Sequence, residues 1–390
     1  MFIFDVIIYA IFAIIMSAFA SMSLRHDPSG KWNRYLTYFV GFFTLICAVR
    51  WNVGVDCLSY VYSFISGKGS GRDEEALWLV FTNFFSDNGI HWTIGMGVIA
   101  FVQILFLTLA LRKYQYILVM LPFVLFGGRY WMDITGLMRQ MTVACVFVWA
   151  TWYVVDKKWI KYVIFIIIAN FIHSSAILLL PVIFMPKSFN VCNKRMLLLG
   201  IFIACLIIGQ TPQFAWFGKY ISFFYDVTNN PNAGSMYQML TKGYVKEALS
   251  YGPMMISYIA IPIFLIWFGP KLSEKYSKSL PTFNIWFNLA YLYGCLYFLV
   301  CNISHIFIRP VQYLELIQMV MAALLLHYLW TEYRKHKRHQ LATFFFCAVI
   351  ATNTFWDVYK AVDAGKSWEI STYKLYFTHR DQARAIGFER

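Results

Sequence analysis

The sequence predicts an all-α, polytopic integral membrane protein with about twelve transmembrane helices. Hydrophobic residues make up 60% of its 390 residues, and charged residues make up only 13%. Ordinary soluble domains contain roughly 25% charged residues, so this composition excludes that class. The apolar residues also come in runs separated by polar loops, and roughly 20 apolar residues let a helix cross a bilayer. We therefore expect the whole chain, residues 1–390, to form a single polytopic membrane domain.

Each apolar run defines one expected span. The first has no basic residue ahead of it, which is typical of a retained span and not of a cleaved signal peptide. Polar or charged residues separate the later runs from one another. In chain order we place the spans at residues 3–22, 34–49, 93–111, 115–128, 138–155, 160–172, 174–185, 196–209, 253–269, 283–300, 310–330 and 341–355.

The basic residues predict the orientation, because loops rich in Lys and Arg stay in the cytoplasm. The loops that follow the odd-numbered spans hold 18 Lys and Arg, and the opposite loops, without the C-terminal tail, hold nine. This bias puts the first set in the cytoplasm and both termini outside. The net charge of +14 then reflects loops that face anionic lipid, and we expect no nucleic-acid partner.

Residues 159–185 allow two interpretations. They form either one long tilted helix broken at His173 or a helical hairpin with His173 at its outer tip. One long helix would invert every later span and place most of the later basic residues outside. The charge rule favours the hairpin.

Three segments are expected on the outer face: residues 50–92, residues 210–252 and the tail at 356–390. The second is dense in aromatic residues around an Asn-Asn-Pro-Asn turn. Polar and aromatic residues together suit a surface that faces carbohydrate. They equally suit a belt that anchors the protein at the level of the lipid headgroups.

The sequence contains none of the common metal or nucleophile motifs. GxSxG, HExxH, Walker and Asp-x-Asp patterns are missing, and the eight cysteines are scattered with no CxxC. The acidic run at residues 73–75 is interpreted as a solvated loop. We therefore expect neither a metal nor another cofactor.

Three arginines stand at the outer ends of expected spans: Arg50, Arg139 and Arg309. Fixed positive charge beside a bilayer indicates a site for an anionic lipid headgroup such as a pyrophosphate. Arg139 opens a span, where its charge opposes the helix dipole but favours a bound anion. The alternative for Arg50 is an ion pair with Asp56 across the turn at Gly54, which would stabilise the loop.

Two histidines are candidate acids or bases. His173 breaks the hairpin and is either a hydrogen-bonded structural residue or a group with a near-neutral pKa. His305 precedes Arg309 by one helical turn, so the two share a face if the helix begins early. Glu315 lies deeper, where an acid needs a partner, and we expect Arg309 or Arg139 to neutralise it.

Taken together these elements resemble the EpsG-like branch of the Wzy-type polysaccharide polymerases. The similarity covers roughly residues 1–330 and leaves out the tail. One departure is Cys57, where the family often has Tyr directly after the Asp. The matching motifs are Arg50-x-x-x-Gly54-x-Asp56-x-x-x-Tyr60, Arg139-Gln140, His173-Ser174-Ser175-Ala176 and Arg309-x-x-x-Tyr313.

The resemblance implies a C-type glycosyltransferase-like enzyme of the bacterial inner membrane. Such an enzyme joins undecaprenyl-pyrophosphate-linked repeat units of O-antigen, capsule or exopolysaccharide at the periplasmic face, without metal, and its partners include the bilayer and a possible chain-length regulator. The implied roles are pyrophosphate binding for Arg50, Arg139 and Arg309, proton acceptance for His173 (the first choice), His305 or Asp56, and support from Gln140, Tyr60, Tyr313 and Glu315.

Three other functions are alternatives, and the sequence does not reveal the acceptor that would separate the first of them from a polymerase. An O-antigen ligase would use the same donor and differ only in its acceptor. A flippase for lipid-linked oligosaccharides would need a charged cavity at the midplane, whereas the charges here gather at the outer end. A membrane O-acyltransferase would more often place its chemistry near the cytoplasm.

Overall fold

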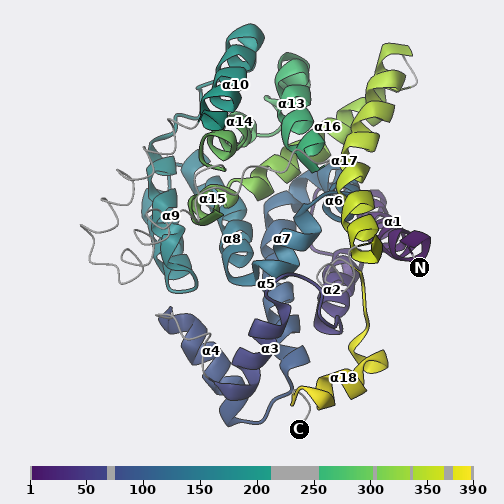
Figure 1. Cartoon of the computed structure of the whole chain (residues 1–390). Helices are drawn as coiled ribbons and strands as arrows, with labels where there is room; N and C mark the ends of the chain where they lie inside the picture. Colours follow the sequence, from purple (N-terminus) through teal and green to yellow (C-terminus); the bar gives the residue numbers. More distant parts are fainter. Residues whose placement is uncertain are drawn as a thin grey trace.

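The computed structural model describes residues 2–67, 75–211, 254–301, 305–333, 337–363 and 372–387 (Figure 1). These residues form helices and no strands, as predicted. The helices, of which those labelled η are 3-10 helices, are α1 (Phe2–His26), α2 (Arg34–Ala48), α3 (Cys57–Ser66), α4 (Ala76–Asp87), α5 (Trp92–Leu111), η1 (Arg112–Tyr114), α6 (Gln115–Gly127), α7 (Tyr130–Gly136), α8 (Met138–Val155), α9 (Trp159–Asn170), η2 (Ser174–Phe184), α10 (Arg195–Gln210), α13 (Met254–Tyr276), α14 (Phe283–Val300), α15 (His305–Gln312), α16 (Glu315–Glu332), α17 (Lys337–Asp363), η5 (Tyr376–Thr378) and α18 (Arg380–Ala385).

Several helices are long and apolar enough to cross a membrane. Length and composition select five stretches in the described residues, and a sixth if α7 and α8 count as one broken span. A further five apolar helices have only 10–17 residues, and they include α2, α9, η2 and α10. The protein is therefore a helical membrane protein, and the expected number of twelve spans stays a prediction.

The first helices pack as two antiparallel pairs. Tyr9 and Phe12 of α1 contact Phe126 at the end of α6, and Ala48 at the end of α2 contacts Gly97 near the start of α5. At the opposite end the loop at Gly30 lies directly against the backbone of η1. The helices α5 and α6 thus run in opposite directions and turn at η1, which agrees with the two spans expected there.

Gly30 has to be glycine at this turn. Its φ of +76° is in the left-handed region, and a Cβ atom there would lie 2.3 Å from the carbonyl oxygen of Arg112. Next to it, the side-chain amide of Gln115 donates to the carbonyl of Asp27 at 2.8 Å. Two loops that were predicted to share the cytoplasmic side therefore touch one another.

The centre of the bundle is α16. From Leu316 to Leu325 each of its residues is buried, which is expected of a helix that is apolar on every side. It packs against α6, α8, α14 and α17. Its N-terminal end lies at the end of the bundle opposite to η1, so the residues there are candidates for a site on the predicted outer face.

Described residues of two of the three predicted outer segments, residues 50–92 and the C-terminal tail, fold together as a small lobe. Its core is a second cluster of buried apolar side chains from α3, α4, the start of α5 and the C-terminal residues, and in Figure 1 these elements lie together below the bundle. The backbone N–H of Trp51 donates to the carbonyl of Lys374, and the N–H of Tyr376 donates to the carbonyl of Val49, each at 2.8 Å. The C-terminal segment thus closes over the loop that begins at Arg50. The aromatic segment at residues 210–252 lies almost entirely outside the described residues.

The orientation can be tested with single cysteines. In a Cys347→Ser background, which removes the exposed native thiol, we expect Val55→Cys to react with a membrane-impermeant maleimide added to intact cells. Lys113→Cys, at the opposite end of the bundle, is the matched control and should react only after the cells are permeabilised. If only Lys113→Cys were labelled from outside, the predicted orientation of the protein in the membrane would be wrong.

Candidate active site

Arg139 lies just after the break in a broken span. The short helix α7 meets α8 at an angle of 115°, and Leu137 between them has non-helical backbone angles. The helix α8 begins at Met138, so Arg139 is in its first turn, as predicted. Its Nη1 donates to Oε2 of Glu75 at 2.8 Å, and its guanidinium carbon lies 5.4 Å from the centre of the Trp78 ring. The side chain is 23% exposed, so an external anion can reach it.

His173 lies at a second break, between α9 and η2. The helices α9 and η2 pack against each other, with the Tyr162 hydroxyl donating to the carbonyl of Leu179, and His173 lies at the tip between them. The predicted hairpin is therefore present. Nδ1 of His173 lies 2.8 Å from the hydroxyl of Tyr313 and 2.9 Å from that of Ser175, and these two hydroxyls are 2.7 Å apart.

Glu75 joins the two sites. While Oε2 accepts from Arg139, Oε1 accepts from the backbone N–H of Ser174 at 3.1 Å. Residues from the start of α4, the start of α8, the α9–η2 tip and the α15–α16 junction thus meet at one place. We call Glu75, Arg139, His173, Ser175 and Tyr313 the His173 cluster.

The electrostatics of the cluster keep His173 neutral. Burial lowers the pKa of His173 to about 4, the nearby Glu75 carboxylate opposes this shift, and the charges of Arg139 and Arg309 add to it. This pKa is below the near-neutral value expected for a catalytic His173, so the imidazole is neutral at pH 7 and a weaker base than predicted. The effect of Arg309 also shows that its charge is close to His173, although it comes from a different helix.

The chain belongs to the EpsG family. The family's sequence model matches residues 33–375, which include every member of the His173 cluster. The EpsG family comprises Wzy-like polysaccharide polymerases and EpsG-like proteins. No curated protein and no solved structure matches this chain.

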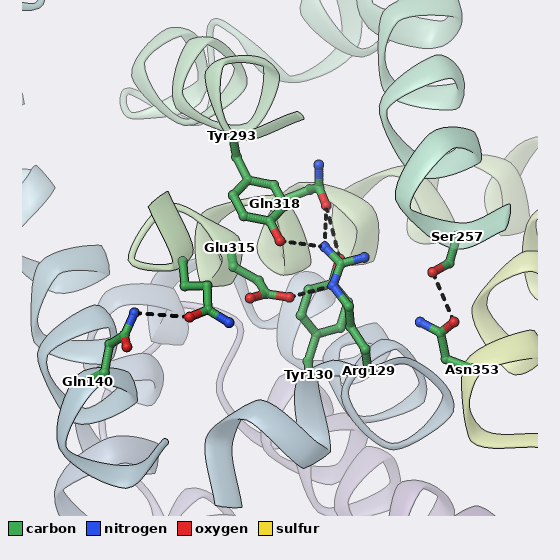
Figure 2. A network of polar contacts seen from close by, with 9 residues as sticks. Arg129, Tyr130, Gln140, Ser257, Tyr293, Glu315, Gln318 and Asn353 are labelled. Carbon is green, nitrogen blue, oxygen red and sulfur yellow. Dashed lines mark hydrogen bonds and ion pairs between the residues drawn. The ribbon is translucent and has the colours of Figure 1, made fainter. Parts of the chain in front are cut away.

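The side chain of Gln140 links the helix that carries Arg139 to the helix that carries Arg309. Its side-chain amide donates to the backbone carbonyl of Arg309 and lies 3.4 Å from Oε1 of Gln312. These contacts tie α15 to the first turn of α8, and Figure 2 shows Gln140 pointing across that gap. Arg309 itself is half-buried. Of the adjacent residues Arg139 and Gln140 that the sequence predicted, the first contacts Glu75 and the second contacts the segment that carries Arg309.

Arg50 is placed differently from the other two arginines. Its side chain is 1% exposed, and its guanidinium fastens the loop after α2 to the α7–α8 break. Its nitrogens donate to the carbonyl oxygens of Cys47 at 2.9 Å, Val53 at 3.3 Å and Thr135 at 3.1 Å, and to the sulfur of Met138 at 3.1 Å. We had expected the carboxylate of Asp56 as the partner of this guanidinium, and these four acceptors are its partners instead. Its predicted contact with pyrophosphate stays a prediction.

Tyr60, another predicted site residue, lies near Arg139. Tyr60 is buried, and its ring packs edge-on against Trp78. Burial raises the pKa of Tyr60, whereas Arg139 lowers it and Asp56 raises it further, so both charges are near the phenol. The side chain of His305, which opens α15, lies outside the described residues. Among the described residues, no group of three His, Cys, Asp or Glu side chains could hold a metal ion.

Glu315 is neutralised by Arg129, which corrects the expectation that Arg139 or Arg309 would do so. Nε of Arg129 donates to Oε1 of Glu315, and both side chains are at most 2% exposed. Nη2 of Arg129 donates to the Tyr293 hydroxyl at 3.0 Å and to Oε1 of Gln318 at 3.1 Å. Figure 2 shows this guanidinium surrounded by polar side chains from α14 and α16.

Aromatic rings complete the surroundings of Arg129. The guanidinium carbon lies 3.7 Å from the centre of the Tyr258 ring, which is close enough for a cation–π interaction. The sequence analysis counted Arg129 only as a loop charge. The signal that it missed is the position of Arg129 between Gly128 and Tyr130 at the end of an apolar span, where a loop could fold back into the bundle.

The Arg129–Glu315 pair yields a stability prediction. Removal of one partner from a buried ion pair leaves an unpaired charge and costs about 3–5 kcal/mol. We expect Arg129→Met and Glu315→Leu each to lower the midpoint of thermal unfolding in detergent. The double variant should be more stable than either single one. The matched control is Lys158→Met, which breaks an exposed pair with Asp156. Single variants as stable as this control would show that the pair does not hold the bundle.

Proposed function

We propose that this protein polymerises lipid-linked oligosaccharide repeat units into surface polysaccharide. Its family and its helices show a polysaccharide polymerase-like membrane protein. The donor that we propose is an oligosaccharide on undecaprenyl pyrophosphate, used at the outer face of the bacterial inner membrane. The proposal rests on one observation. Arg139 and the neutral His173 lie in one cluster at the same end of the bundle.

The reaction needs an anion site and a proton acceptor side by side. In the proposed step a hydroxyl of the acceptor sugar attacks the anomeric carbon of the donor, the bond from that carbon to the pyrophosphate oxygen breaks, and the lipid pyrophosphate leaves. His173 takes the hydroxyl proton. Arg139 and Arg309 balance the charge that develops on the leaving group.

The hydroxyls around His173 are compatible with Nε2 as the base. With Tyr313 and Ser175 both at Nδ1, a proton on Nδ1 can be donated to either oxygen, and Nε2 is then the acceptor. Tyr313 is on the segment that carries Arg309, so the orientation of His173 is coupled to the placement of the pyrophosphate. A polymerase gains from this coupling, because the base is aligned only where the donor is held.

Substitution of the two arginines tests the anion site. We expect Arg139→Ala and Arg309→Ala to abolish polymer while the protein remains inserted and folded. Arg139→Lys should rescue poorly because an ammonium lacks the planar fork that binds two phosphate oxygens. Arg195→Ala, at an exposed arginine of α10, is the control and should make polymer of normal length. Normal polymer from both site variants would contradict the pyrophosphate assignment.

The proposed enzyme should work without a metal, because arginines would supply the positive charge that a divalent cation supplies elsewhere. We expect the purified enzyme in proteoliposomes to keep its rate in EDTA. The measurement is polymer formed per minute before and after chelation, with a magnesium-dependent glycosyltransferase treated in parallel. Activity that disappears with EDTA and returns with magnesium or manganese would require a metal site.

A further inference from the structure

The carboxylate of Glu75 lies inside the candidate active site. From the sequence, this residue was expected in a solvated loop. It is the N-cap residue of α4, in the small lobe, and its side chain is only 13% exposed. Its two oxygens do not cap that helix. They accept from Arg139 and from the N–H of Ser174, both of which belong to the bundle. The lobe thus places one negative charge between the anion-binding arginine and the turn that carries His173.

The place that Glu75 occupies suits a phosphate oxygen equally well. A guanidinium binds carboxylate and phosphate with the same geometry, and a backbone N–H beside it is a second donor for either anion. The Arg139 side chain is 23% exposed, so its guanidinium can be reached by a phosphate oxygen from outside the cluster. In the ligand-free protein Glu75 therefore neutralises a charge that the donor would otherwise neutralise.

We propose that Glu75 is a positioning residue that competes with the donor's pyrophosphate for Arg139 and, once displaced, supports the protonated form of His173. This inference rests on the proposed function, because it assigns the pyrophosphate to Arg139. The arriving anion takes the guanidinium, and the carboxylate, which is already close enough to His173 to affect its protonation, turns to the imidazole. Donor binding would thereby prepare the base.

Each charged group that faces His173 acts in this sequence. Before binding, Arg139 and Arg309 disfavour an imidazolium and Glu75 favours it. A bound pyrophosphate cancels the two arginines and leaves the effect of Glu75 in place. The hydroxyls of Tyr313 and Ser175 contact Nδ1 and keep the ring oriented. The proton affinity of His173 should therefore rise when the donor binds.

A binding measurement without turnover tests the competition. We expect Glu75→Gln to bind inorganic pyrophosphate about two- to fivefold more tightly than wild type, the effect that loss of a partly exposed ion pair supports. Glutamine keeps the acceptor for Ser174 and removes only the charge. The matched control is Glu332→Gln, which breaks the pair with Lys275 at the other end of the bundle. Unchanged or weaker binding by Glu75→Gln would overturn the proposal, since a merely structural carboxylate would weaken the site when removed.

Kinetics test the second half of the inference. In Glu75→Gln we expect KM for the donor to fall while kcat falls by about tenfold, which is less than the roughly hundredfold or more that a general base itself contributes, because Glu75 acts through His173. The acid limb of kcat should also move to lower pH than in wild type, because the imidazolium of the complex loses its carboxylate partner. A fall in kcat with an unchanged acid limb would contradict the role toward His173. Failure of wild type to make polymer would instead refute the proposed function, and the pyrophosphate titration would still decide the competition.

Discussion

The guanidinium of Arg129 lies in an apolar helical bundle, where a charge without a partner is not tolerated. Glu315 neutralises it, and the hydroxyl of Tyr293 and the amide oxygen of Gln318 accept further hydrogen bonds from it; these residues come from α14 and α16. These contacts fix the start of α16 against the junction of α6 and α7. Tyr313 is two residues before Glu315, so the same interaction sets where the candidate active site can form. The pair acts on the site through backbone position, without facing the proposed pyrophosphate.

The site is built from ends and breaks of helices. Arg139 follows the break between α7 and α8, His173 lies between α9 and η2, and Tyr313 lies between α15 and α16. Breaks expose backbone groups that need partners inside a membrane protein. Here the N–H of Ser174 donates to the carboxylate of Glu75, and the carbonyl of Arg309 accepts from the side-chain amide of Gln140. Polar side chains that bind backbone groups and polar side chains that form the candidate site are therefore neighbours.

Much of the helical framework could be predicted from the sequence, because hydropathy reports long apolar helices directly. The expected span at 138–155 coincides with α8, and the one at 283–300 coincides with α14. The hairpin at His173 was also predicted, from charge bias alone. Helices α3, α4 and α7 were missed because they have only 10, 12 and 7 residues, and a search for spans of roughly 20 apolar residues passes over them.

The site was predicted in part. Arg139, His173 and Tyr313 came from motif order, and the structure brings them together. The partner of Glu315 was predicted wrongly, because loops fold back into the bundle in ways that sequence spacing does not reveal. Glu75 was missed for a related reason: only the docking of the small lobe on the bundle brings its carboxylate to Arg139 and Ser174. The most direct test of the central claim is to give purified protein in proteoliposomes a defined lipid-linked repeat unit and to measure released lipid pyrophosphate together with polymer length. The account predicts one lipid pyrophosphate released for each new glycosidic bond, and no release from His173→Gln. Release without chain growth, or movement of intact donor across the bilayer without release, would contradict it.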